Sequence, residues 1–212
     1  MNKTQASAKR TVRKAVRSTP TRRMGPAGSE NWHAMLDGAE AILRDEGYAA
    51  VTSRRVAERI GVKQRLVYYY FHTMDDLVVE TFRRRSAREL ERLRGALASA
   101  QPLRQIWDVC VHTSDARLIT EFTALANRNQ ALRKEVIAFI EDSRAIQMKA
   151  LRAAIARKPS GCKIPPLGLA LLATSTALSL IRESDLGVSV GHREIHKVIH
   201  DFLSELEPNP RS

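Results

Sequence analysis

Apolar side chains recur at helical spacing from about residue 29 onward. Between Trp32 and Leu43 they return every three or four positions, the interval that places side chains on one face of a helix. Ser29 precedes this run and is a suitable N-cap, while Gly47 follows it and is a suitable helix stop. The pattern therefore predicts a first helix between Ser29 and Gly47.

Two short helices and a long one are predicted next. The first short helix is capped by Thr52 or Ser53 and ends at Gly61, and the other lies at about residues 63–72. Thr73 followed by Asp76 forms a capping box, which predicts that a long helix runs from there to about residue 99.

The second half of the chain keeps the helical spacing and predicts five more helices. One of them, Gln130–Arg157, has apolar positions over roughly half of its circumference, so we expect it to be central and contacted from several sides. No segment has the alternation of a β-hairpin. The predicted fold class is all-α, with about nine helices in total.

Residues 164–181 form an uncharged run of 18 residues, a length close to that of a membrane span. Two prolines open the run, and hydroxyl side chains from Thr174 to Ser179 dilute its apolar character. A helix buried on most sides by protein is therefore favoured over a membrane helix.

The net charge of +12 indicates an anionic partner, either nucleic acid, an acidic membrane or an acidic protein. Eight basic residues and no acid lie in residues 1–28, which leaves +4 for the remainder of the chain. We expect this segment to be a disordered basic arm, of a composition that suits nucleic-acid binding or a transit peptide. Cys110 and Cys162 are too few for a disulfide framework or a zinc site, which favours a reducing, cytoplasmic setting.

The two short helices, joined by Gly61-Val62-Lys63, predict a helix-turn-helix, whose second helix enters the major groove of DNA. A helical wheel divides the aromatic run of this second helix between two faces. Leu66, Val67, Tyr70 and Phe71 are expected in the core. Facing outward are Gln64, Arg65, Tyr68 and Tyr69, whose side chains can hydrogen-bond bases and phosphates.

The segment "GYAAVTSRRVAERIGVKQRLVYYYFHTMDDL" resembles the N-terminal signature of the TetR/AcrR family of bacterial transcriptional regulators. The resemblance covers about residues 30–80: a Gly-Tyr and a Thr, an Ala-x-x-x-Gly-Val turn, and a Tyr-x-Tyr-Phe ending before a Leu. Lys63 replaces the usual capping Ser or Thr, Arg65 a commonly small residue, and Met74 a frequent phosphate-binding Lys.

The resemblance implies DNA contacts by residues at matching positions, namely Arg54, Gln64, Arg65, Tyr68 and Tyr69. Basic residues nearby and in the arm add further candidates, namely Arg55, Lys63, Arg22 and Arg23. The solvated helix surface is the competing interpretation for each side chain.

The resemblance also implies a homodimer on a palindromic operator in double-stranded DNA, formed by the last two helices. Helix eight is too apolar for a surface exposed to water, which supports an interface independently. The candidate interface residues are Leu171, Leu178, Ile181, Ile199 and Phe202.

A small-molecule pocket among helices four to eight is implied as well, with a small organic effector favoured. The candidate lining residues are Trp107, Cys110, Phe122, Leu125, Phe139 and Met148. Each of these would also fit a plain hydrophobic core.

The sequence contains no Gly-rich phosphate loop or catalytic triad motif, so we expect no enzyme activity and no cofactor. His192, His196 and His200 recur along helix nine, but no Cys or carboxylate pattern completes a metal site. We therefore predict a DNA-binding regulator with an arm at 1–28, a DNA-binding domain at 29–77 and a ligand-binding and dimerisation domain at 78–207. The alternative is a non-specific, nucleoid-type protein that acts through its basic arm.

Overall fold

The computed structural model describes residues 25–112, 115–157 and 164–208. These residues contain nine α-helices and a short 3-10 helix without any strand, which confirms the all-α prediction. The elements are α1 (Glu30–Glu46), η1 (Tyr48–Ala50), α2 (Ser53–Arg59), α3 (Gln64–Tyr70), α4 (Met74–Leu97), α5 (Pro102–His112), α6 (Ala116–Ala126), α7 (Gln130–Arg157), α8 (Pro166–Asp185) and α9 (His192–Leu206).

Local capping determines where the N-terminal helices begin. The Ser29 hydroxyl accepts a hydrogen bond from the Trp32 N–H at 3.3 Å, and Thr52 caps α2 in the same way. The capping box at α4 is complete, because Thr73 Oγ1 accepts from the Asp76 N–H at 3.0 Å and Asp76 Oδ2 accepts from the Thr73 N–H at 2.9 Å. Lys63 gives α3 no side-chain cap.

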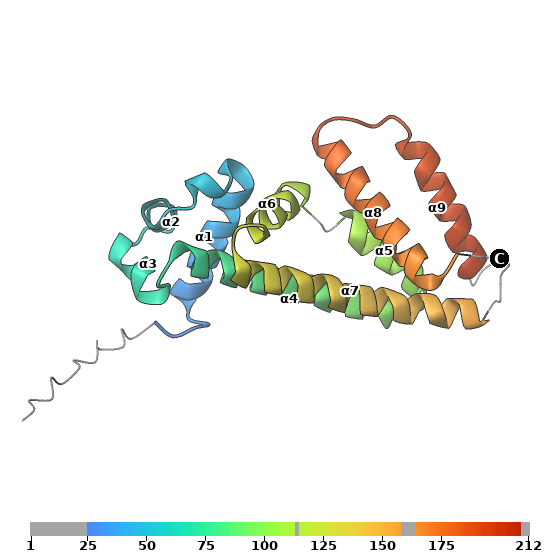
Figure 1. The fold of residues 1–212 in the computed structure, drawn as a ribbon, viewed down its shortest axis with the longest axis horizontal. Helices are drawn as coiled ribbons and strands as arrows, with labels where there is room; N and C mark the ends of the chain where they lie inside the picture. Colours follow the sequence, from blue (N-terminus) through green and yellow to red (C-terminus); the bar gives the residue numbers. More distant parts are fainter. Residues whose placement is uncertain (1–24, 113–114, 158–163, 209–212) are drawn as a thin grey trace, which may run out of the picture.

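Helices α1, α2 and α3 lie at one end of the molecule and α8 and α9 at the other (Figure 1). Between the two ends, α4 and α7 pack side by side along the long axis. Helix α4 thus leaves the predicted helix-turn-helix and continues into the body of the protein.

Two hydrophobic clusters fill the molecule. The first, here called the head cluster, joins α1, α2 and α3 to the start of α4, to α6 and to Leu132 of α7. The second, the body cluster, joins the end of α4 to α5, α7, α8 and α9. At its far end, the carboxylate of Glu207 accepts from the Leu103 and Arg104 N–H groups at 2.9 and 3.1 Å, so the end of α9 is tied to the start of α5.

Helix α7 packs against α4, α5, α6 and α8, which confirms that several elements contact it, although Ile137 and Ile140 remain 46% and 42% exposed. The prediction that α8 is buried on most sides is wrong for the single chain. On α8, four leucines are 40–56% exposed instead of buried by protein: Leu167, Leu171, Leu172 and Leu178.

Candidate DNA-binding surface and effector cavity

The turn between α2 and α3 fixes how α3 presents its side chains. Gly61 has φ of 70°, which a residue with a Cβ rarely adopts, and the Val62 N–H closes the turn onto Ala57 O at 2.9 Å. Tyr70 is then buried, whereas Tyr68 and Tyr69 are 36% and 41% exposed.

The predicted division of the aromatic run is confirmed, since Phe71 is also buried and Gln64 and Arg65 are exposed. Lys63 is exposed as well, at the start of the same helix.

The buried hydroxyl of Ser53 connects two of the candidate DNA-binding side chains. Ser53 Oγ accepts a hydrogen bond from Gln64 Nε2 at 2.8 Å and donates one to the Tyr68 hydroxyl at 2.9 Å. Gln64 keeps its amide oxygen and a second N–H free, and the Tyr68 hydroxyl keeps its own proton to donate. Sequence reasoning considered Ser53 only as a helix cap, because this bond depends on the angle between α2 and α3.

The arginines of α2 are held by carboxylates. Arg54 pairs with Glu58 at 2.8 Å, and Arg55 pairs with Glu46 of α1 at 2.9 Å. By contrast, Arg65 forms no ion pair or hydrogen bond with another described residue. Arg65, like Lys63, is therefore free to bind an anion, whereas Arg54 and Arg55 are not.

The segment before α1 packs against the end of α3. The Gly25 N–H donates to Tyr69 O at 2.9 Å, and a Cβ at residue 25 would come within 2.5 Å of the Tyr70 ring. The Ser29 hydroxyl also donates to the Tyr70 hydroxyl at 3.0 Å. The arm candidates Arg22 and Arg23 lie outside the described residues.

A cavity of about 220 Å³ lies between α4, α5, α6, α7 and α8. Of the candidates predicted from the sequence, Cys110, Phe122 and Phe139 line it. Trp107 and Met148 pack against the body cluster and Leu125 against the head cluster, so these three are not part of the lining. The full lining is Phe82, Arg85, Ser86, Glu89, Leu93, Cys110, Ile119, Phe122, Thr123, Val136, Phe139, Ile140, Ser143, Arg144, Gln147, Thr174 and Leu178.

The polar part of the cavity was not found from the sequence, because charged positions on α4 and α7 are ordinary features of solvated helices. Three of its members are ionisable: Arg85, Glu89 and Arg144. Burial raises the pKa of the Glu89 carboxyl, although Arg92 at 3.5 Å acts in the opposite direction. Burial also raises the pKa of the Cys110 thiol to about 11, so the thiol is neutral at pH 7.

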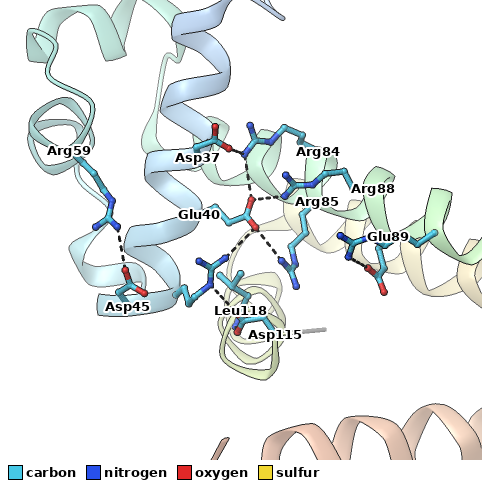
Figure 2. Close-up of polar contacts among 12 residues, drawn as sticks. Asp37, Glu40, Asp45, Arg59, Arg84, Arg85, Arg88, Glu89, Asp115 and Leu118 are labelled. Carbon is cyan, nitrogen blue, oxygen red and sulfur yellow. Dashed lines mark hydrogen bonds and ion pairs between the residues drawn. The ribbon is translucent and has the colours of Figure 1, made fainter. Parts of the chain in front are cut away.

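A carboxylate of α1 joins the helix-turn-helix to α4. Glu40 is surrounded by Arg84, Arg85 and Arg88 of α4, at 3.4, 3.1 and 2.8 Å (Figure 2). Arg44 of α1 approaches the same carboxylate at 3.6 Å. The sequence shows several acids between Glu30 and Glu46, but their spacing does not reveal that one of them is buried among arginines.

Helix α6 forms a second link between the cavity and the head of the molecule. Its residues Ile119 and Phe122 line the cavity, while Glu121 Oε2 accepts from the Tyr48 N–H at 3.3 Å. At its start, Asp115 Oδ2 accepts from Arg44 Nε at 2.6 Å. Both α4 and α6 therefore connect the cavity lining directly to α1 and η1.

Helices α8 and α9 contain all the interface candidates, but the chain places them differently. Leu171 and Leu178 are exposed, and Leu178 also lines the cavity. Ile181 is buried within the chain, and Ile199 and Phe202 pack against the body cluster. The exposed apolar face consists mainly of α8 leucines, together with Val198 of α9.

Neither a metal site nor a membrane span appears in the described part of the chain. Residues 25–112, 115–157 and 164–208 hold no group of three or more His, Cys, Asp or Glu side chains that could bind a metal ion. His192 instead contacts Glu183 at 3.0 Å. None of the described helices is both long enough and apolar enough to cross a bilayer.

Comparison with known proteins identifies the helix-turn-helix. Residues 35–81 match the family described as "Bacterial regulatory proteins, tetR family". The helix-turn-helix is therefore that of the TetR family of bacterial regulators, and this match together with the fold supports a DNA-binding transcriptional regulator. A comparison with curated protein sequences finds no match.

Solved structures of TetR-like regulators share the fold over most of this chain. A putative transcriptional regulator from Saccharomonospora viridis in complex with choline is 18% identical, with a TM-score of 0.72, and covers 82% of this chain and 96% of its own. A putative transcriptional regulator from Pseudomonas aeruginosa PAO1 is 18% identical, with a TM-score of 0.68, and the match covers 83% of this chain and 89% of that one. A TetR transcription regulator from Haloarcula marismortui ATCC 43049 is 18% identical, with a TM-score of 0.65, and the match covers 83% of this chain and 95% of that one. The likeness extends the family's fold to the cavity-bearing helices.

Proposed function

We propose that this TetR-family protein is a homodimeric repressor in the cytoplasm, which a small organic effector releases from a palindromic operator. The observation that carries the proposal is a continuous connection between two sites. The exposed face of α3 lies at one end of α4, and the cavity lies along the same helix. We assign residues 29–77 to DNA binding and 78–207 to effector binding and dimerisation, with α4 crossing between them.

Reading of the operator is assigned to α3 in the major groove. Arg65 is free to form a bidentate contact with guanine, and Gln64 retains an amide oxygen and an N–H for adenine. The Tyr68 hydroxyl can donate to a phosphate, and Ser53 holds both Gln64 and Tyr68 before DNA arrives. Arg54, Arg55, Lys63 and Tyr69 surround this face and are assigned to backbone contacts.

Dimerisation is assigned to the exposed face of α8, because contiguous apolar surface of this kind usually marks an interface. A two-fold dimer requires a palindromic site whose half-sites lie one helical turn, about 34–36 Å, apart. A change of a few ångströms in the separation of the two α3 helices therefore prevents both from binding at once.

Release is assigned to an effector in the cavity that changes the position of α4 and α6. Such an effector must bind the released form better, and a tenfold preference corresponds to about 1.4 kcal/mol per site. Reciprocity then requires that operator DNA weaken effector binding by the same factor.

The test begins with selection of bound sequences from random DNA by the full chain. A palindromic consensus is expected, with retained preference in the presence of competitor DNA. Equal affinity for all DNA with a steep salt dependence would instead support the nucleoid-type alternative, which nothing in the comparisons favours.

Metabolites are then screened for release from the selected operator, and calorimetry measures effector affinity with and without the operator. An effector that binds equally well in both states would contradict its role as the release signal.

A further inference from the structure

The cavity has a polar wall as well as an apolar one, and the charges of the polar wall do not balance. Glu89 pairs with Arg92 at 3.5 Å, so its negative charge already has a counter-ion; burial raises the pKa of its carboxyl, and Arg92 and Arg85 act to lower it. The neutral Cys110 thiol adds none. The remaining ionisable groups of the lining, Arg85 and Arg144, are cations.

Arg144 has no counter-ion among the residues that the structure describes. It lines the cavity from α7, is partly buried, and forms no hydrogen bond or ion pair with another described residue. Its guanidinium therefore presents N–H donors at the cavity wall that a ligand oxygen can accept from.

Arg85 is only partly neutralised. Its ion-pair partner, Glu40, lies at 3.1 Å and is shared with Arg44, Arg84 and Arg88, while Glu89 and Asp115 interact with it electrostatically without forming an ion pair. In this cluster four arginines face three acids, since Asp37 and Asp115 also pair with Arg84 and Arg44. Positive charge is therefore in excess on the α4 side of the cavity as well as on the α7 side.

We propose that the effector is a compact organic acid, whose carboxylate binds Arg85 and Arg144 and whose apolar body lies against Phe82, Phe122 and Phe139. This inference rests on the proposed function and adds the chemical class of the ligand. With about 30 Å³ for each water-sized group, the cavity of about 220 Å³ holds about seven such groups. A ligand of around ten non-hydrogen atoms, part of it at the cavity opening, fits this size.

The same arrangement connects ligand charge to DNA binding. Among the described residues, only Arg85 both lines the cavity and contacts Glu40 of α1. A carboxylate that binds Arg85 competes with Glu40 for its N–H groups, and so weakens one of the contacts that hold α1 against α4.

The experiment compares size-matched probes that differ in charge. Calorimetry on the full chain measures the binding of 3-phenylpropionate, 3-phenylpropanamide and 3-phenylpropylammonium, and of octanoate, octanamide and octylammonium. We expect each carboxylate to bind at least about tenfold more tightly than its amide, because hydrogen bonds between ionised partners are the stronger ones. Each ammonium is expected to bind more weakly still.

Four variants locate the effect. Arg144→Gln and Arg85→Gln should each reduce the preference for carboxylate over amide to less than about threefold. Arg88→Gln also removes a contact with Glu40 but lies outside the cavity lining, and Arg152→Gln removes an exposed arginine of α7. Both control variants should retain the full preference for carboxylate over amide. If Arg85→Gln does not fold, the result for Arg144→Gln alone tests the proposal.

Equal or tighter binding of the amide or the ammonium, equal loss in the control variants, or no binding of any probe overturns the assignment. Parallel release assays on the selected operator separate it from the proposed function. If an amide binds as tightly as its carboxylate and releases the protein from the operator, the proposed release mechanism stands and the assignment of the effector as an organic acid fails. If a carboxylate binds through Arg144 but the protein stays on the operator, the ligand class stands and the proposed release mechanism fails.

Discussion

The two hydrophobic clusters differ in how completely a single chain buries them. In the head cluster Met35, Leu36, Ile42, Val67 and Leu77 are all 0% exposed. In the body cluster the leucines and Ile106 are 3–9% exposed, and four leucines of the neighbouring α8 surface are about half exposed. The head therefore completes its core within the chain, whereas the body leaves apolar surface exposed, as the proposed dimer requires.

The largest effect is expected from a charge on the exposed face of α8. Leu171→Asp should convert the dimer to a monomer or unfold the body, because each uncompensated charge in a dry interface is unfavourable by about 3–5 kcal/mol. Light scattering at micromolar concentration measures the mass. Val190→Asp is the matched control, since Val190 is 90% exposed in the loop before α9 and should leave the dimer unchanged. A wild-type monomer, or a dimer that survives Leu171→Asp, would remove the interface from α8.

Shortening a buried side chain of the head cluster should destabilise the protein to the same extent whether or not it dimerises. Leu36→Ala is expected to lower the free energy of unfolding by about 2–5 kcal/mol through lost burial and a residual cavity. Denaturant unfolding at several protein concentrations checks this, because the loss should be the same at each concentration. A loss that shrinks as protein concentration rises would show that the head, too, depends on the partner.

The recognition surface belongs to the head, and its key side chain is predicted to matter for specificity alone. Arg65→Ala should weaken binding to the best operator by about 1–3 kcal/mol and relax the preference at one base position, with no change in the unfolding free energy. Fluorescence anisotropy on the selected and mismatched operators measures this. Arg152→Ala, an exposed change on α7 next to Leu151 of the body cluster, is the control. An Arg65→Ala variant with intact base preference would assign the reading to other residues.

The smallest effect concerns the contact between α1 and the start of α6, where Arg44 pairs with Asp115. Burial raises the pKa of this carboxyl, but hydrogen bonds from the Leu118 N–H and from Arg44 outweigh burial, and the net result is a lowered pKa. A carboxyl with a lowered folded pKa stabilises the protein above its unfolded pKa of about 3.9, and this contribution is lost as the pH falls through the folded value.

Asp115→Asn keeps the helix cap and removes the charge. It should reduce stability at pH 7 by roughly 0.5–1 kcal/mol, a small amount because the pair is screened by solvent. Thermal unfolding at pH 7 and at about pH 3 measures the difference, which should shrink at the lower pH. A difference that is the same at both pH values would mean that the charge of Asp115 does not contribute.

Features set by neighbouring residues in the chain were predictable from the sequence. The Thr73–Asp76 capping box, the Gly61 turn and the division between Tyr69 and Tyr70 all depend on interactions within a few positions, so spacing alone determines them.

Features that depend on how distant helices meet were not predictable. Leu125 and Arg144 lie on neighbouring helices, but only Arg144 lines the cavity, because the crossing of α6 and α7 turns Leu125 into the head cluster. In the same way, the periodicity of α7 marks Ile137 as apolar without revealing that no helix of the same chain covers it. The burial of Glu40 among arginines likewise depends on the register of α1 against α4.

The carboxylates beside the arginines of α2 have a consequence for how quickly the regulator finds its operator. Glu46 and Glu58 already occupy Arg55 and Arg54, so each of these arginines must exchange a carboxylate for a phosphate when it contacts DNA. Binding to arbitrary sequence therefore gains less than the number of arginines would indicate. A genome offers at least about a million competing sites, and a shorter stay at each of them shortens the search. The acids next to the recognition surface thus favour rapid scanning over tight attachment, which leaves prolonged residence to sites where α3 also finds its bases.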